Sequence, residues 1–151
     1  MDNQQLSLSE FDLGWMIGII DGEGCIGLWS RGGERKHTFK PGLRMSNTSK
    51  VLIDKFTGML DIIECPYHII YYKPRNERSK EYWTVSIEGF KRLTKILPLI
   101  KDRLVEKNQQ ANLVWEWVQS RSSKWHHSEL SYRELEIPKI VSAMNHRGFR
   151  N

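Results

Sequence analysis

The feature that most constrains the fold is an apolar run near the N-terminus in which a glycine returns at every fourth position. Gly14, Gly18 and Gly22 fall on one face of a helix, and each interior glycine costs about 1 kcal/mol relative to alanine. Close approach of a second backbone is the usual compensation for such small residues. We expect this helix to be buried on most sides because its other members are largely apolar: Phe11, Leu13, Trp15, Met16, Ile17, Ile19 and Ile20.

Polar residues mark both ends of this predicted helix. It should begin after Ser7 or Ser9, and Ser7 with Glu10 has the spacing of a capping box. At the other end, Asp21 and Glu23 lie at the negative pole of the helix dipole, where an acid costs up to about 1 kcal/mol. Two explanations stay open with equal weight: a bound cation or other positive partner, or a hydrogen bond to a nearby backbone N–H or lysine.

The remainder of the chain alternates between strand-like and helix-like patterns. Phe39, Leu43 and Met45 would share one face of a strand, and Pro98 should break or restart a helix. The order αββαββα plus C-terminal helices predicts one α+β domain over 1–151, with helices on one face of an antiparallel four-stranded sheet. The expected strands are 25–31, 38–47, 67–73 and 81–87, and the expected later helices are 49–60, 89–97, 103–120 and 132–146.

The charge of the chain is unevenly distributed. Residues 1–24 hold five acids and no Lys or Arg, whereas 25–50 hold six basic residues and one acid, and 73–80 hold four basic residues and one acid. Compact basic segments suit a polyanion, and the phosphate backbone of a nucleic acid is the usual one. The plainer alternative is that these segments are solvated loops.

Composition excludes several classes of protein. Hydrophobic residues make up 39% and charged residues 27%, which argues against wholesale disorder. No apolar stretch is long enough to span a membrane, and the polar N-terminus is unlike a signal or transit peptide. Two cysteines cannot form a disulfide framework or a zinc site alone. We therefore expect an intracellular protein, in the cytoplasm, nucleoid or an organelle matrix.

The segment 16–24, Met-Ile-Gly-Ile-Ile-Asp-Gly-Glu-Gly, resembles the signature of the LAGLIDADG homing endonucleases. Gly18, Asp21 and Gly24 match it, and Glu23 replaces an Asp with the charge kept. Gly22 replaces Ala, and the first two residues depart from Leu-Ala. The order of elements is similar to the family fold, as are the segments 45–48 and 107–114. The signature occurs once, which in this family implies a homodimer.

The resemblance implies a function and a set of site residues. Two signature helices would pack at a two-fold axis through Gly14, Gly18 and Gly22, bringing two copies of Glu23 together. Mg²⁺ would be held by Glu23 and the carbonyl of Gly22, with Mn²⁺ or Ca²⁺ as substitutes in binding. By the same resemblance, the remaining catalytic residues are Asn47 and Lys107. The plainer alternatives are a turn-forming asparagine and a lysine in a surface salt bridge.

Recognition would fall to the saddle-shaped sheet, because a β-ribbon fits the major groove of DNA. The function implied is site-specific cleavage of double-stranded DNA at a long pseudo-palindromic target. Three alternatives stay open: an RNA maturase acting on an intron, a DNA-binding regulator, and a basic protein-interaction module. The residues expected to contact DNA are Trp29, Arg31, Thr38, Lys40, Arg44, Lys73, Arg75, Arg78 and Lys80.

Overall fold

The fold is a four-stranded antiparallel sheet with helices packed mainly on one side. It was obtained as a computed structural model that describes residues 7–32, 38–124 and 128–146. The predicted α+β class and the order αββαββα followed by further helices are confirmed. The elements are α1 (Glu10–Glu23), β1 (Gly24–Ser30), β2 (Phe39–Asn47), α2 (Lys50–Ile62), β3 (His68–Tyr72), β4 (Tyr82–Glu88), α3 (Phe90–Ile100), α4 (Asn108–Ser122) and α5 (Tyr132–His146).

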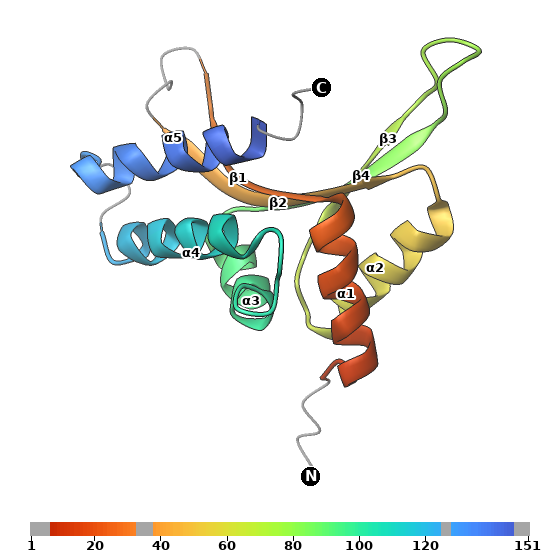
Figure 1. Cartoon of the computed structure of the whole chain (residues 1–151), viewed down its shortest axis with the longest axis horizontal. Coiled ribbons are helices and arrows are strands. Elements are labelled where there is room, and N and C mark those ends of the chain that lie inside the picture. Colours follow the sequence, from red (N-terminus) through yellow and green to blue (C-terminus); the bar gives the residue numbers. More distant parts are fainter. Residues whose placement is uncertain (1–6, 33–37, 125–127, 147–151) are drawn as a thin grey trace.

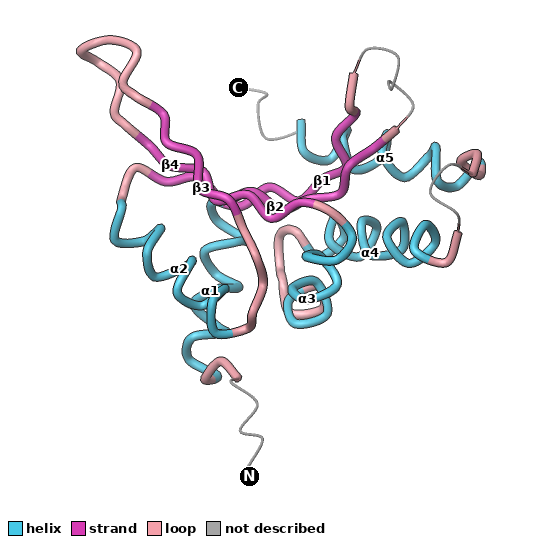
Figure 2. Tube along the Cα trace, turned by 180° about the vertical axis from the view of Figure 1, so that it is seen from behind, coloured by secondary structure: helices cyan, strands magenta, loops and turns pink. Residues whose placement is uncertain are grey.

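The sheet has the strand order β1-β2-β4-β3, so two hairpins meet through β2 and β4 at its centre. The two hairpins curve away from helices α1 to α4 on either side of this centre, which gives the sheet its saddle shape (Figure 1). Helices α1 to α4 lie on the convex side (Figure 2). Within each hairpin the paired strands are consecutive in the sequence. In this sheet, the β2–β4 pairing is the one that joins segments far apart in the sequence.

Alternation along the strands decides which side chains enter the core. Leu43 and Met45 of β2 and Val85 and Ile87 of β4 are fully buried against the helices, as the predicted pattern requires for the first two. The intervening residues face the other side of the sheet. No helix in the described part of the chain has the length and apolar character needed to cross a membrane.

Helix α1 begins where predicted but is less buried than predicted. Its N-cap is Ser9, whose hydroxyl accepts the N–H of Asp12 at 3.1 Å, so the capping box from Ser7 was wrong. The prediction of burial on most sides was also wrong, because within this chain only Leu13, Met16 and Ile20 are buried. Phe11 is 78% exposed, so α1 presents an apolar outer face that the other described elements do not cover.

Two helix boundaries differ from the prediction. Pro98 lies inside the last turn of α3, which continues to Ile100, since the fully buried Leu97 and Ile100 hold that turn against the core. Helix α4 begins at Asn108 rather than near Arg103. The preceding backbone is held away from helical geometry because its N–H groups bond a side chain of α1, described below.

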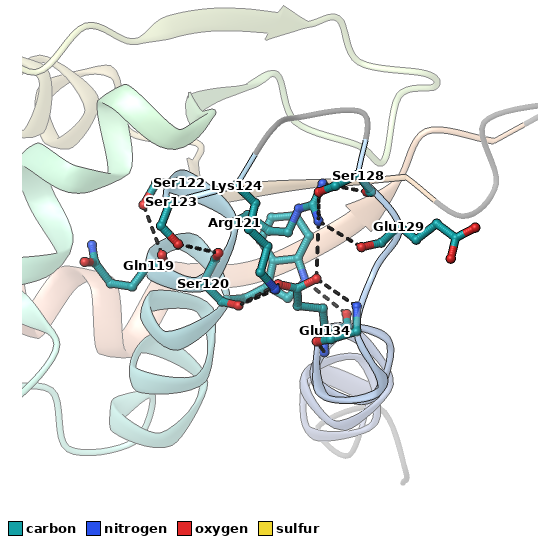
Figure 3. A network of polar contacts seen from close by, with 11 residues as sticks. Gln119, Ser120, Arg121, Ser122, Ser123, Lys124, Ser128, Glu129 and Glu134 are labelled. Atoms are coloured by element: carbon teal, nitrogen blue, oxygen red, sulfur yellow. Dashed lines mark hydrogen bonds and ion pairs between the residues drawn. The ribbon is translucent and has the colours of Figure 1, made fainter.

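A buried ionic network joins α4 to α5 (Figure 3). Glu134 is 1% exposed, and its carboxylate accepts hydrogen bonds from Arg121 at 3.3 Å, from Lys124 and Ser120, and from the N–H of Ser131 at 2.9 Å. Burial alone would raise the pKa of Glu134, but these donors outweigh it and lower the pKa to about 2. The network fixes α5 beside the sheet.

Helix α5 covers the open edge of the sheet at β1. The side-chain amide of Asn145 donates to the carbonyl oxygen of Ile26 at 2.9 Å, satisfying an acceptor that the edge strand leaves unpaired. An uncovered edge strand invites pairing with other chains, so this helix protects β1. Trp117 of α4 is 2% exposed and donates to the carbonyl of Glu134 at 3.0 Å.

Candidate active site and nucleic-acid interface

A pocket opens at the C-terminal end of α1, where the helix meets the sheet. It has a volume of about 320 Å³ and is lined by Glu23, Ser46, Asn47, Thr48 and Tyr82. The chain turns directly from α1 into β1 and from β2 toward α2, so both turns deliver polar side chains to the same place. Two of the three residues expected to be catalytic, Glu23 and Asn47, are therefore together.

Glu23 is exposed at the end of α1, and its carboxylate has no hydrogen bond or ion pair among the described residues. The side chain of Asn47 uses one of its polar groups in a hydrogen bond within the chain. Its Oδ1 accepts the N–H of Ser49 at 2.7 Å, and Ser49 in turn caps α2. The turn-forming role of Asn47 is thus present, while its side-chain N–H₂ group has no partner in the described part of the chain.

Asp21 plays a structural part at the end of α1. Its carboxylate accepts the N–H groups of Val105 at 2.8 Å, Glu106 at 3.2 Å and Lys107 at 3.1 Å. Of the two explanations for an acid at this helix end, the hydrogen bond to backbone N–H therefore holds for Asp21. The same bonds tie the loop before α4 to α1, which is why α4 begins later than the sequence pattern predicts.

Lys107 is placed beside the site rather than in the pocket. Its ammonium group donates to the carbonyl oxygen of Asp21, at the negative end of the helix dipole. Burial raises the pKa of the Cys25 thiol, and the nearby positive charges of Lys107 and Arg44 oppose that rise. Lys107 therefore lies between the end of α1 and the start of β1, and the residue that it contacts, Asp21, precedes Glu23 by two positions.

The oxygen ligands at the pocket are too few to hold a hard cation by themselves. Such an ion would need further ligands from a second copy of the chain, a phosphate group or water. No group of three or more His, Cys, Asp or Glu side chains able to hold a metal occurs among the described residues. Glu23 supplies one uncommitted carboxylate, and the carbonyl of Gly22 lies next to it in sequence. Mg²⁺ is commonly bound by one or two carboxylates together with phosphate oxygens and water, which matches this partial set.

The glycine face of α1 makes no contact with other elements among residues 7–32, 38–124 and 128–146. A Cβ placed on Gly14, Gly18 or Gly22 would meet no atom of the described residues within 4 Å, the helix's own backbone aside. All three glycines are exposed. No contact within the described part of the chain therefore explains the cost of three glycines in one helix.

The expected DNA-contacting residues lie in two groups. Arg31 and Thr38 are exposed beyond the β1–β2 pairing, and Trp29, Lys40 and Arg44 lie on the open face of the sheet. The second group is exposed around the turn between β3 and β4, and no ion pair involves it among the described residues: Lys73, Arg75, Arg78 and Lys80.

Sequence reasoning missed Glu88 at the end of β4. Its carboxylate bonds Lys40 at 2.9 Å, Arg44 at 2.6 Å and the hydroxyl of Ser86 at 2.9 Å. Burial alone would raise the pKa of Glu88, but these bonds lower it to about 2. Alternation along 81–87 could have placed position 88 on the same face as Ser86, but the register of β2 against β4 that sets Arg44 near it has no local sequence signal.

Comparisons with known proteins identify the fold. No protein-family model and no curated protein sequence matches the chain. Among solved structures, the archaeal intron-encoded homing endonuclease I-Vdi141I, complexed with DNA, matches with a TM-score of 0.70 and 14% identity, covering 94% of this chain and 89% of that one. The homing endonuclease I-CvuI, complexed with a DNA target in the presence of magnesium, matches with a TM-score of 0.64 and 16% identity over 94% and 87%.

A third structure, the LAGLIDADG homing endonuclease I-GzeII in complex with its DNA target, has a TM-score of 0.60 and 15% identity. The match covers 87% of this chain and 43% of that one. At these identities the likeness concerns the fold alone. The chain therefore has the fold of the LAGLIDADG homing endonucleases.

Proposed function

We propose that this protein is one subunit of a homodimeric, metal-dependent endonuclease that cleaves double-stranded DNA at a specific site. One observation carries the proposal: the uncommitted carboxylate of Glu23 opens onto a pocket shared with Asn47, at the end of a helix whose glycine face is exposed. The shared fold with DNA-bound homing endonucleases supports it. The uneven distribution of basic residues is consistent with a DNA partner.

The homodimer is argued from α1. Its outer face combines glycines with the exposed Phe11, and burying apolar surface together with close backbone approach would offset the cost of the glycines. A two-fold interface is self-complementary, so one such face per chain is sufficient. Pairing α1 with its copy side by side would bring two Glu23 carboxylates close together, where a cation is needed to relieve their repulsion.

The cation supported by this donor set is Mg²⁺, which when bound would promote attack of water on the scissile phosphate and stabilise the leaving oxygen. Glu23 and the Gly22 carbonyl would hold it. The free N–H₂ of Asn47 would orient the attacking water. The charge of Lys107, held by the Asp21 carbonyl, would lie near the negative phosphate and favour the more highly charged transition state.

The sheet supports a long target. Strand β2 has nine residues, which at about 3.3 Å each span about 30 Å, or about nine base pairs at 3.4 Å per pair. Two copies would follow about eighteen base pairs, and a two-fold protein favours a pseudo-palindromic sequence. The exposed basic turn between β3 and β4 would lie at the outer ends of this site.

The experiment separates binding from cleavage. Duplexes bound by the wild-type protein are selected from a random pool with Ca²⁺, cloned into a plasmid, and incubated with Mg²⁺. We expect linearisation by wild type and by the control Glu10→Gln, an exposed acid at the other end of α1. Glu23→Gln should bind the same duplexes and leave the plasmid intact. Equal cleavage by Glu23→Gln refutes the catalytic assignment, and preferential retention of RNA favours the maturase alternative.

A further inference from the structure

The open face of the sheet carries a connected set of side chains, which we call the sheet cluster: Trp29, Lys40, Arg44, Ser86 and Glu88. Glu88 lies at its centre and is the least exposed of its charged members, with 17% of its side chain accessible, against 44% for Lys40 and 43% for Arg44. Both oxygens of Glu88 are used, Oε2 by Lys40 and Oε1 by Arg44 and Ser86. The carboxylate is therefore fixed in position.

The indole of Trp29 forms one wall of this cluster, and two glycines make room for it. Gly27 and Gly42 are paired across β1 and β2. A Cβ on Gly42 would lie 2.4 Å from the Trp29 ring, and one on Gly27 would lie 3.2 Å from it. The Trp29 ring therefore packs close to the backbone at these two glycines, where a Cβ would crowd it, and the guanidinium of Arg44 packs on the ring with Cζ 4.1 Å from its centre.

These contacts leave one edge of Arg44 available. Its Nε and Nη2 donate to Glu88 Oε1 at 3.0 and 2.6 Å. Nη1 has no hydrogen-bond partner among the described residues. The two N–H groups of Nη1 and the second N–H group of Nη2 are therefore available to donate to a ligand. This pair of nitrogens forms the planar fork that bonds O6 and N7 of guanine in the major groove.

We propose that Arg44 reads a guanine at one position of each half-site, and that Glu88 and Trp29 hold its guanidinium in the orientation for reading. The inference rests on the proposed function. A phosphate contact would not require such support, and a fixed carboxylate beside the arginine would be repelled by phosphate. The exposed turn residues such as Arg78 have no comparable support and suit phosphate contacts.

The position of the guanine follows from the register. Arg44 precedes Asn47 of the pocket by three residues on β2, which is about 10 Å of strand or about three base pairs. We therefore expect the guanine about three base pairs from the cleaved bond. Because the proposed dimer is two-fold, it should occur at two symmetric positions.

The test is selection of duplexes from a random pool by each of five proteins, followed by sequencing and by thermal unfolding of each protein to confirm folding. They are wild type, Arg44→Lys, Glu88→Gln, and two matched controls at exposed positions, Arg103→Lys in the loop before α4 and Glu77→Gln in the turn between β3 and β4. Arg44→Lys should lose on the order of 10- to 100-fold of guanine preference at the two symmetric positions alone. Both controls should keep the wild-type base preferences.

Glu88→Gln should weaken the same two preferences while strengthening binding to unrelated duplexes and steepening its salt dependence, because it releases Lys40 and Arg44 to bind phosphate. Unchanged base preferences in folded Arg44→Lys overturn the inference and leave the endonuclease proposal standing. If Glu88→Gln binds all duplexes more tightly and keeps the wild-type guanine preference at both positions, the orienting role of Glu88 is overturned. If wild type selects no consensus, the proposed function itself fails, and the reading role of Arg44 fails with it.

Discussion

Adding methyl groups to the glycine face of α1 gives opposite results depending on whether that face contacts a partner. In the isolated chain, Cβ atoms at Gly14 and Gly18 would meet no atom of the described residues within 4 Å, the helix's own backbone aside. Each glycine-to-alanine change should then stabilise the helix by about 1 kcal/mol. Because this gain is present in monomer and dimer alike, it leaves the dissociation constant unchanged.

If two copies of α1 pack through this face, the double variant Gly14→Ala/Gly18→Ala places four methyl groups at the contact of the dimer. Overpacking typically costs about 1 to 3 kcal/mol per site, so the dimer should lose about 4 kcal/mol or more. That corresponds to a dissociation constant raised by about a thousandfold or more. Sedimentation equilibrium over a range of concentrations measures this shift directly.

Gly58→Ala provides the matched control. Gly58 is exposed within α2, and a Cβ there would also meet no atom of the described residues within 4 Å, the helix's own backbone aside. It should raise the unfolding temperature by roughly 2 to 4 °C and leave the mass in solution unchanged. The reasoning is refuted if the double variant behaves as two such controls, with an unfolding temperature raised by roughly 4 to 8 °C and the wild-type dissociation constant retained.

Two further changes test polar contacts that join separate elements of the fold. Glu134→Gln removes the negative charge of a buried network and replaces one of its two acceptor oxygens by a donor, and it should cost about 3 to 5 kcal/mol of unfolding free energy, as measured by urea denaturation against the exposed control Glu129→Gln. Because the pKa of Glu134 is lowered to about 2 from 4.5, the wild type should lose this stability as pH falls from about 5 toward 2; an equally steep acid loss in Glu134→Gln would contradict the assignment. Asp21→Asn should speed hydrogen exchange at the N–H groups of 105–107, and unchanged protection there would show that the carboxylate does not hold the loop.

Much of the fold could be predicted because its signals are local. The cap at Ser49 and the alternation of Leu43 and Met45 with polar residues depend only on near neighbours in the chain. The predicted start of α4 failed because the N–H groups that would continue it bond Asp21, more than eighty residues away. The break at Pro98 failed because tertiary burial of the flanking Leu97 and Ile100 outweighs the local effect of proline.

Some residues of the candidate site could likewise be found from local sequence signals, and others could not. The motif around Glu23 and the turn at Asn47 could be found by reading along the sequence, and the structure places both on one pocket. Glu88 could not be found, since its role depends on the pairing that sets β4 against β2. Lys107 could be placed near α1 only by resemblance, and its contact with the Asp21 carbonyl depends on how the loop packs.

By itself, the sequence determined the elements, the face of each strand that enters the core, and the segment that carries the acidic site, because periodicity, capping and turn residues act over a few positions. Only the tertiary structure decided that the glycine face of α1 stays exposed. It also decided that the carboxylate of Asp21 accepts hydrogen bonds from backbone N–H groups while that of Glu23 does not, and that Glu88 holds Arg44 beside Trp29. These outcomes depend on which distant segments meet, and hydrogen bonds and ion pairs between such segments form only when the whole core positions their partners within reach.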